Sequence, residues 1–130
     1  MADDGRNIHP HALPNYQNAE IAREKLEGYA LNPNHEAARP DGSSGKDKAR
    51  VFKAALGFDQ SNWEILKQRI LDELPYHEAV FEAERKNWGK AYRVDMPILG
   101  VNGSTKNVRT AWIVRHGKDD PSLVTLLVLP

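Results

Sequence analysis

Residues 63–84 read WEILKQRILDELPYHEAVFEAE, and the spacing of the apolar residues changes in the middle of this stretch. Before Pro75 the apolar residues recur at intervals of three and four, as on one face of a helix: Trp63, Leu66, Ile70 and Leu74. After Pro75 the apolar residues begin to alternate with polar ones, which is typical of β-strands. The change divides the chain into a helical first part and a second part made of strands.

The second part contains four segments whose patterns predict strands: Ala79–Glu84, Ala91–Met96, Val108–His116 and Leu123–Leu129. The segments between them, residues 86–89, 100–104 and 117–121, are short and rich in Gly, Asn and Asp. Short connections of this kind join antiparallel neighbours, because parallel strands need a long crossover. The sequence therefore predicts an α+β fold, with N-terminal helices packed on a four-stranded antiparallel β-sheet.

The first part predicts three helices. One covers residues 20–29, and a second runs to Leu56 and ends at Gly57. A third begins at Ser61, which forms a capping-box pattern with Glu64. Residues 1–18 contain two prolines and no apolar period, so we expect a linker or flexible arm there and a single domain over residues 19–130.

The composition limits the kinds of fold and site that the chain can form. The chain has 130 residues, 40% of them hydrophobic, enough for one domain with one core, and it has no apolar segment long enough to span a membrane. The formal net charge is zero, although residues 46–130 carry 14 Lys and Arg against 11 Asp and Glu. The absence of Cys excludes disulfides, thiolate zinc sites and a thiol nucleophile. The five His residues are scattered, so we expect neither a metal site nor a cofactor.

Lys48 does not fit the pattern of the second helix. On a helical wheel it falls between Ala55 and Phe52, within the apolar arc, whereas Lys46, Arg50 and Lys53 lie on the opposite side. An ammonium group in that position pairs with a carboxylate, extends past the helix end, or faces an open cleft. In the last case it would point over the sheet toward a bound phosphate.

The strand at residues 108–116 also has two mixed faces. One carries Val108, Thr110, Trp112, Val114 and His116, and the other carries Arg109, Ala111, Ile113 and Arg115. Thr125 is the polar residue of an otherwise apolar last strand. Each of these polar residues could pack or hydrogen-bond within the sheet, or it could contact a substrate. His35, in a long loop, is a candidate acid or base because imidazole titrates near neutral pH.

Several separated motifs, in the same order, resemble a family of small domains at the C-termini of bacterial polymorphic and contact-dependent growth inhibition toxins. They include Leu31-Asn32-Pro33-Asn34-His35, Lys48-Ala49-Arg50-Val51-Phe52, Tyr92-Arg93-Val94-Asp95-Met96-Pro97-Ile98, Val108-Arg109-Thr110-Ala111-Trp112-Ile113 and Pro121-Ser122-Leu123-Val124-Thr125. The likeness extends from about Leu13 to Val128. The order of helices and strands is also similar to the fold group of the barnase, EndoU, colicin and RelE ribonucleases.

The resemblance implies an antibacterial toxin domain with metal-independent endoribonuclease activity, cleaving tRNA in the cytoplasm of a target cell. The domain would be delivered as the C-terminal part of a larger surface protein, without a membrane anchor of its own, and would bind a cognate immunity protein. We expect Lys48, Arg109, Thr110, Thr125 and His35 to be catalytic. We expect Lys46, Trp112 and Arg115 to bind the RNA.

Two other functions fit the sequence. Glu84-Arg85-Lys86, preceded by Asp72, matches the acidic-x-Lys element of a metal-dependent DNase. A non-enzymatic module that binds a protein partner through its mixed-charge surface is the second alternative.

Overall fold

The computed structural model describes residues 5–34 and 45–130, with residues 45–47 described by their backbone alone. The α-helices are α1 (Arg23–Lys25), α2 (Gly45–Leu56) and α3 (Trp63–Glu73). Short helical turns accompany them: η1 (Tyr16–Asn18), η2 (Leu26–Ala30), η3 (Gln60–Asn62) and η4 (Leu74–Tyr76). The strands are β1 (Ala79–Arg85), β2 (Gly89–Leu99), β3 (Thr105–Arg115) and β4 (Ser122–Val128). The predicted α+β class is confirmed.

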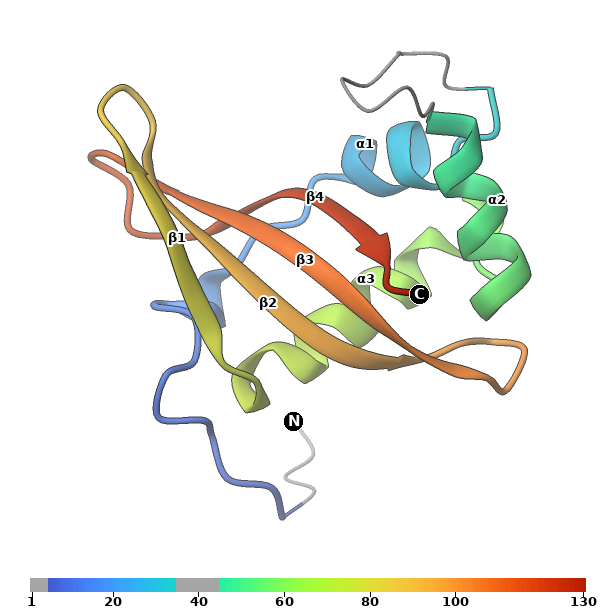
Figure 1. Ribbon diagram of the computed structural model, residues 1–130, viewed down its shortest axis with the longest axis horizontal. Helices are drawn as coiled ribbons and strands as arrows, with labels where there is room; N and C mark the ends of the chain where they lie inside the picture. The colour runs from blue at the N-terminus through green and yellow to red at the C-terminus, as the bar shows by residue number, and fades with distance from the viewer. Residues whose placement is uncertain (1–4, 35–44) are drawn as a thin grey trace.

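The four strands form one antiparallel sheet in the order β1-β2-β3-β4, so each strand pairs with its neighbour in the chain. β2 and β3 are longer than the alternation predicted, because they pair without interruption from Gly89 opposite Arg115 to Leu99 opposite Thr105. Figure 1 shows the sheet as a twisted meander, with the β1–β2 turn at one end and the β2–β3 turn at the other.

Helix α3 lies across one face of the sheet, behind the strands in Figure 1. Leu66, Ile70 and Leu74 on its inner side are fully buried, as the spacing before Pro75 predicts. They pack against sheet residues that include Val94 and Trp112. The opposite face of the sheet, which we call the open face, points toward the viewer in Figure 1. In the described part of the chain, no helix is long and apolar enough to span a membrane.

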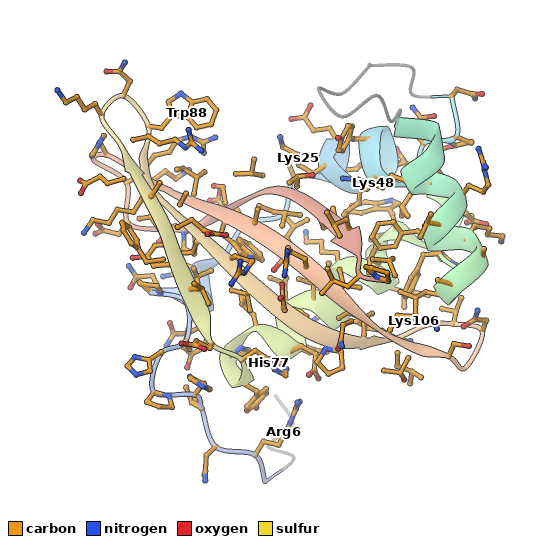
Figure 2. The ribbon with its side chains drawn as sticks, in the orientation of Figure 1. Arg6, Lys25, Lys48, His77, Trp88 and Lys106 are labelled. Atoms are coloured by element: carbon orange, nitrogen blue, oxygen red, sulfur yellow. The ribbon has the colours of Figure 1, made fainter. Side chains whose placement is uncertain are left out.

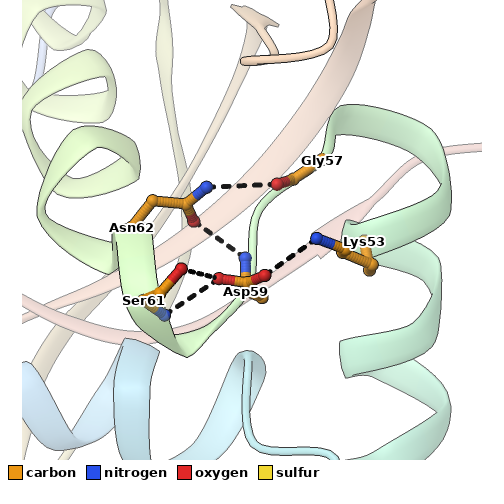
Figure 3. Close-up of polar contacts among 5 residues, drawn as sticks. All are labelled: Lys53, Gly57, Asp59, Ser61 and Asn62. Carbon is orange, nitrogen blue, oxygen red and sulfur yellow. Dashed lines mark hydrogen bonds and ion pairs between the residues drawn. The ribbon is translucent and has the colours of Figure 1, made fainter.

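The cap before α3 differs from the predicted one. Asp59, not Ser61, caps the helical turn η3 that leads into α3, and Asn62 completes a capping box by accepting a bond from the Asp59 N–H. The Asp59 carboxylate accepts bonds from the Ser61 N–H and hydroxyl and from the Lys53 ammonium (Figure 3). The Ser61–Glu64 prediction is wrong because the chain makes one 3₁₀ turn before the α-helix begins.

Two differences concern the N-terminal part. The sequence predicts Glu20 in the first helix, but its backbone pairs with the start of β4 through bonds with Pro121 and Leu123, so the helical turns begin only at Arg23. Leu13 lies in the core with 1% of its surface exposed. The packed part of the chain therefore begins before residue 19.

Candidate functional site

The strand register determines which side chains share the open face. Arg93, Ala111 and Thr125 lie directly opposite one another on β2, β3 and β4. The next row on the same face is Asp95 and Arg109, with Leu127 beyond them. Thr125 and Arg109 are diagonal neighbours across the β3–β4 pair, where side chains typically lie about 7–8 Å apart. The small Ala111 leaves space between the longer side chains around it.

Lys48 reaches this face from α2, which packs beside β4. Its Nζ donates a hydrogen bond to the Thr125 hydroxyl at 3.0 Å and lies 5.0 Å from the centre of the Tyr29 ring. Figure 2 shows Lys48 on the side of α2 that faces α1 and β4. The contact with Thr125 and the aromatic ring explains how a cation is accommodated within the apolar arc of α2.

Arg109 forms a two-pronged ion pair with Asp95. Arg109 Nε and Nη2 donate to the two carboxylate oxygens of Asp95 at 2.9 and 3.0 Å. The hydrogen bonds from Arg109 lower the pKa of Asp95, outweighing the effect of burial, and the bonds to Asp95 raise the pKa of Arg109. The pair uses one edge of the guanidinium, so the Nη1 edge of Arg109 is directed away from Asp95. About two-fifths of each side chain remains exposed, at 40% and 37%.

A groove of about 620 Å³ runs along the open face next to this cluster. Its charged lining residues are Arg85, Arg93, Arg109 and Glu82, three positive and one negative. Ala91 and Ala111 form part of its floor, and small side chains there create the hollow. Trp88 stands at the end formed by the β1–β2 turn, with 58% of its surface exposed. The lining of this groove therefore carries more positive than negative side chains, although the whole chain is neutral.

Two of the expected site residues belong to the core instead. Thr110 is fully buried, where its hydroxyl donates to the Val94 carbonyl at 2.7 Å and accepts from Trp112 Nε1 at 2.8 Å. Trp112 is 1% exposed, on the face covered by α3. Thr110 therefore has no hydroxyl proton left for a substrate, and the Trp112 ring is not accessible for stacking on a base. The structure gives both residues a packing role.

The other expected residues lie apart from the cluster or outside the described residues. Arg115 shares a face with Arg109 by register, but it lies at the end of β3 and lines a separate hollow with Lys25 and Lys67. His35 and the Lys46 side chain fall outside the described residues. Lys86 lies in the β1–β2 turn, and no three His, Cys, Asp or Glu side chains of residues 5–34 and 48–130 gather as metal ligands would.

The sequence pattern assigns no site role to Arg85, Trp88 or Arg93. Trp88 carries a detectable signal, because a Trp in a turn of polar residues has no strand face into which its ring can be buried. Arg93 follows from the strand alternation only once the pairing with Ala111 is known. The charges on one face of a sheet come from several strands, and a single strand does not reveal them.

Comparisons with known proteins are consistent with this architecture. No curated protein matches the chain in sequence. A chain from the solved "Contact-dependent growth inhibition toxin - immunity protein complex from Klebsiella pneumoniae 342" has a similar fold, with a TM-score of 0.62 and 10% sequence identity. The match covers 84% of this chain and 98% of that one. At such low identity the likeness shows the fold alone.

The family model described as "Domain of unknown function (DUF6883)" matches residues 12–130. The match covers nearly the whole chain and includes the open face and its cluster, and the protein therefore belongs to this family.

Proposed function

We propose that this chain is the toxin domain of a contact-dependent growth inhibition system and acts as a metal-independent endoribonuclease on tRNA. The fold similarity to a chain of a toxin–immunity protein complex supports the toxin role. In this proposal the domain is the C-terminal part of a larger surface protein, acts in the cytoplasm of the target cell, and is inactivated by an immunity protein.

The observation that carries the proposal is the Lys48–Thr125 pair beside Arg109 on an open sheet face. Lys48 donates to the oxygen of Thr125, so the Thr125 hydroxyl keeps its own proton for another acceptor. A phosphate oxygen placed there would accept that proton in a hydrogen bond and would lie near the Lys48 ammonium. The Thr125 hydroxyl and the Lys48 ammonium would then both bind the same phosphate.

The proposed reaction uses the nucleophile that RNA itself provides. The ribose 2′-oxygen forms a bond to phosphorus, the bond from phosphorus to the 5′-oxygen breaks, and the products are a 2′,3′-cyclic phosphate and a 5′-hydroxyl. Lys48 and the free edge of Arg109 stabilise the charge that develops on the phosphorane, which is generally the largest catalytic contribution. A general base takes the 2′-hydroxyl proton and a general acid protonates the leaving 5′-oxygen, and we assign one of these two roles to His35.

The same face fits the proposed immunity partner. The groove has an excess of arginine, and a protein with acidic side chains complementary to Arg85, Arg93 and Arg109 would cover it. Binding there would exclude RNA by occupying the surface on which the phosphodiester is held.

The activity test uses purified protein and total tRNA in the presence of EDTA. We expect discrete fragments with 2′,3′-cyclic phosphate and 5′-hydroxyl ends. Lys48→Ala should lower the cleavage rate by about 100-fold or more, the loss typical of one transition-state donor. Thr125→Val keeps the shape of the side chain but removes the hydroxyl, and should lower the rate by about 10-fold, as for loss of a hydrogen bond to a charged group.

Lys106→Ala is the matched control, because Lys106 is an exposed lysine on β3 near the opposite end of the sheet from Trp88 (Figure 2). Intact tRNA with the wild-type protein, or equal rates for the wild type and Lys48→Ala, would contradict the proposal. Cleavage of plasmid DNA that EDTA abolishes would favour the metal-dependent DNase. A domain that is harmless on expression and has no nuclease activity would favour the protein-binding module.

A further inference from the structure

Trp88 is an exposed aromatic residue at one end of the basic groove. It lies in the turn between β1 and β2 (Figure 2), and 58% of its surface is accessible. An exposed indole of this size costs solvation free energy, and its ring is not part of the core. Its position next to arginine side chains suggests a ligand with both a flat apolar face and a negative charge.

The backbone holds Trp88 in a fixed place although its ring is exposed. The Trp88 N–H donates to the Arg85 carbonyl at 3.0 Å, and the Trp88 carbonyl accepts from the His116 N–H at 3.1 Å. Gly89 follows with φ 135°, and a Cβ at that position would lie 1.9 Å from the Val114 carbonyl oxygen. The turn therefore packs closely against the end of β3, and these backbone contacts fix the position from which the Trp88 side chain extends.

Arg85 supplies a cation next to the indole. It lines the groove with Trp88, and the two residues also line a smaller hollow of about 260 Å³ at the turn itself. Arg109 and Arg93 have carboxylate partners in Asp95 and Glu82, whereas Arg85 forms no ion pair with any residue in the described part of the chain. Its guanidinium can therefore bind a phosphate without first breaking an ion pair.

We propose that the Trp88–Arg85 end of the groove binds one unpaired nucleotide of the RNA substrate, with the base stacked on the indole and the phosphate on Arg85. The inference rests on the proposed function and defines its substrate as single-stranded at this point. Stacking requires a free base face, which a nucleotide inside a duplex does not offer. The site should tolerate any base, because every base has a stacking face.

The test measures binding separately from cleavage. The probe is a short single-stranded oligodeoxynucleotide, which lacks the 2′-hydroxyl and cannot be cleaved by the proposed route. We expect Trp88→Ala to weaken binding by about 5-fold or more, within the usual range for one stacked base. Arg85→Ala should lower the slope of log K against log salt by about 0.7, the value for one phosphate contact on a single strand. Binding should quench tryptophan fluorescence, and Trp88→Phe should remove most of this quenching.

Phe81→Ala is the matched aromatic control, because Phe81 is 53% exposed but lies on the other face of the sheet. It should bind the probe like the wild type, and an abasic version of the probe should bind the wild type and Trp88→Ala equally. Equal affinity of Trp88→Ala and the wild type for the normal probe would overturn the nucleotide site, as would tighter binding of a duplex. If Trp88→Ala loses binding while tRNA stays intact, the nucleotide site stands and the nuclease proposal fails.

Discussion

At the scale of single residues, Thr110 shows how one hydroxyl can hold two parts of the core together. It donates to the Val94 carbonyl on β2 and accepts from the Trp112 indole on its own strand. We expect Thr110→Val to destabilise the fold by about 1–3 kcal/mol, because the buried Trp112 N–H loses its acceptor. Urea unfolding at an unchanged m-value would measure this loss.

Thr110→Ser separates the hydroxyl from the methyl group. Serine keeps the donor and the acceptor, so this variant should lose only the packing of one methyl group, about 1 kcal/mol. Equal losses in the two variants would show that the hydroxyl contributes little.

The candidate site could be predicted from the sequence only in part. Lys48 violates the helical pattern of α2, and the structure places it against Thr125. The strand alternation puts Trp112 and Thr110 on the same face, but the sequence does not show which face of the sheet α3 covers. Which tryptophan, Trp112 or Trp88, is accessible for stacking depends on the face that α3 covers. The pairing of Arg109 with Asp95 depends on the register between β2 and β3.

At the scale of elements, the Asp59 cap links two helices. Its carboxylate binds Lys53 of α2 and Ser61 of η3 (Figure 3). These bonds lower the pKa of Asp59 from its usual 3.8 to about 2, with the bond from Lys53 the largest cause. We expect Asp59→Ala to cost about 1 kcal/mol at neutral pH, the typical value for an N-cap, since solvent screens the exposed ion pair.

The pH dependence of this cost follows from the sign of the shift. The pKa is lower in the folded state, so the contribution of the charge is fully present above pH 3.8 and is lost as the pH falls toward about 2. The difference in unfolding free energy between the wild type and Asp59→Ala should shrink over that window. A difference that stays constant from neutral pH down to pH 2 would show that the carboxylate charge plays no part.

The elements were predicted well where their pattern is long and regular. The α3 face and the four strands follow directly from residue spacing, because burial on one side imposes a period of 3.6 or 2. The first helix was predicted too long, since the pairing of Glu20 with β4 is a long-range contact that local propensity cannot reveal. A contact between elements also explains the cap. Asp59, and not Ser61, is the capping residue, and Asp59 has an additional bond from Lys53 of α2.

At the scale of the whole molecule, the N-terminal segment is attached to both layers of the fold. The His9 N–H donates to the Pro75 carbonyl after α3, and the Ala79 N–H at the start of β1 donates to the His11 carbonyl. Arg6 forms a two-pronged ion pair with Glu73 at the end of α3. The segment for which the sequence predicts a linker or arm thus connects the helix to the first strand.

Leu13 is where this segment enters the core, and it provides a test of the domain boundary. We expect Leu13→Ala to destabilise the protein by about 2–5 kcal/mol, since the side chain is 1% exposed and its removal leaves a cavity. Ile8→Ala is the matched control, because Ile8 belongs to the same segment but is 56% exposed, and it should change stability little. A chain that begins at Ala19 should lose more than Leu13→Ala, as it loses the backbone bonds from His9 and His11 too. Thermal and urea unfolding would measure the stability of the three variants. If the chain that begins at Ala19 is as stable as the wild type, the domain boundary lies at residue 19.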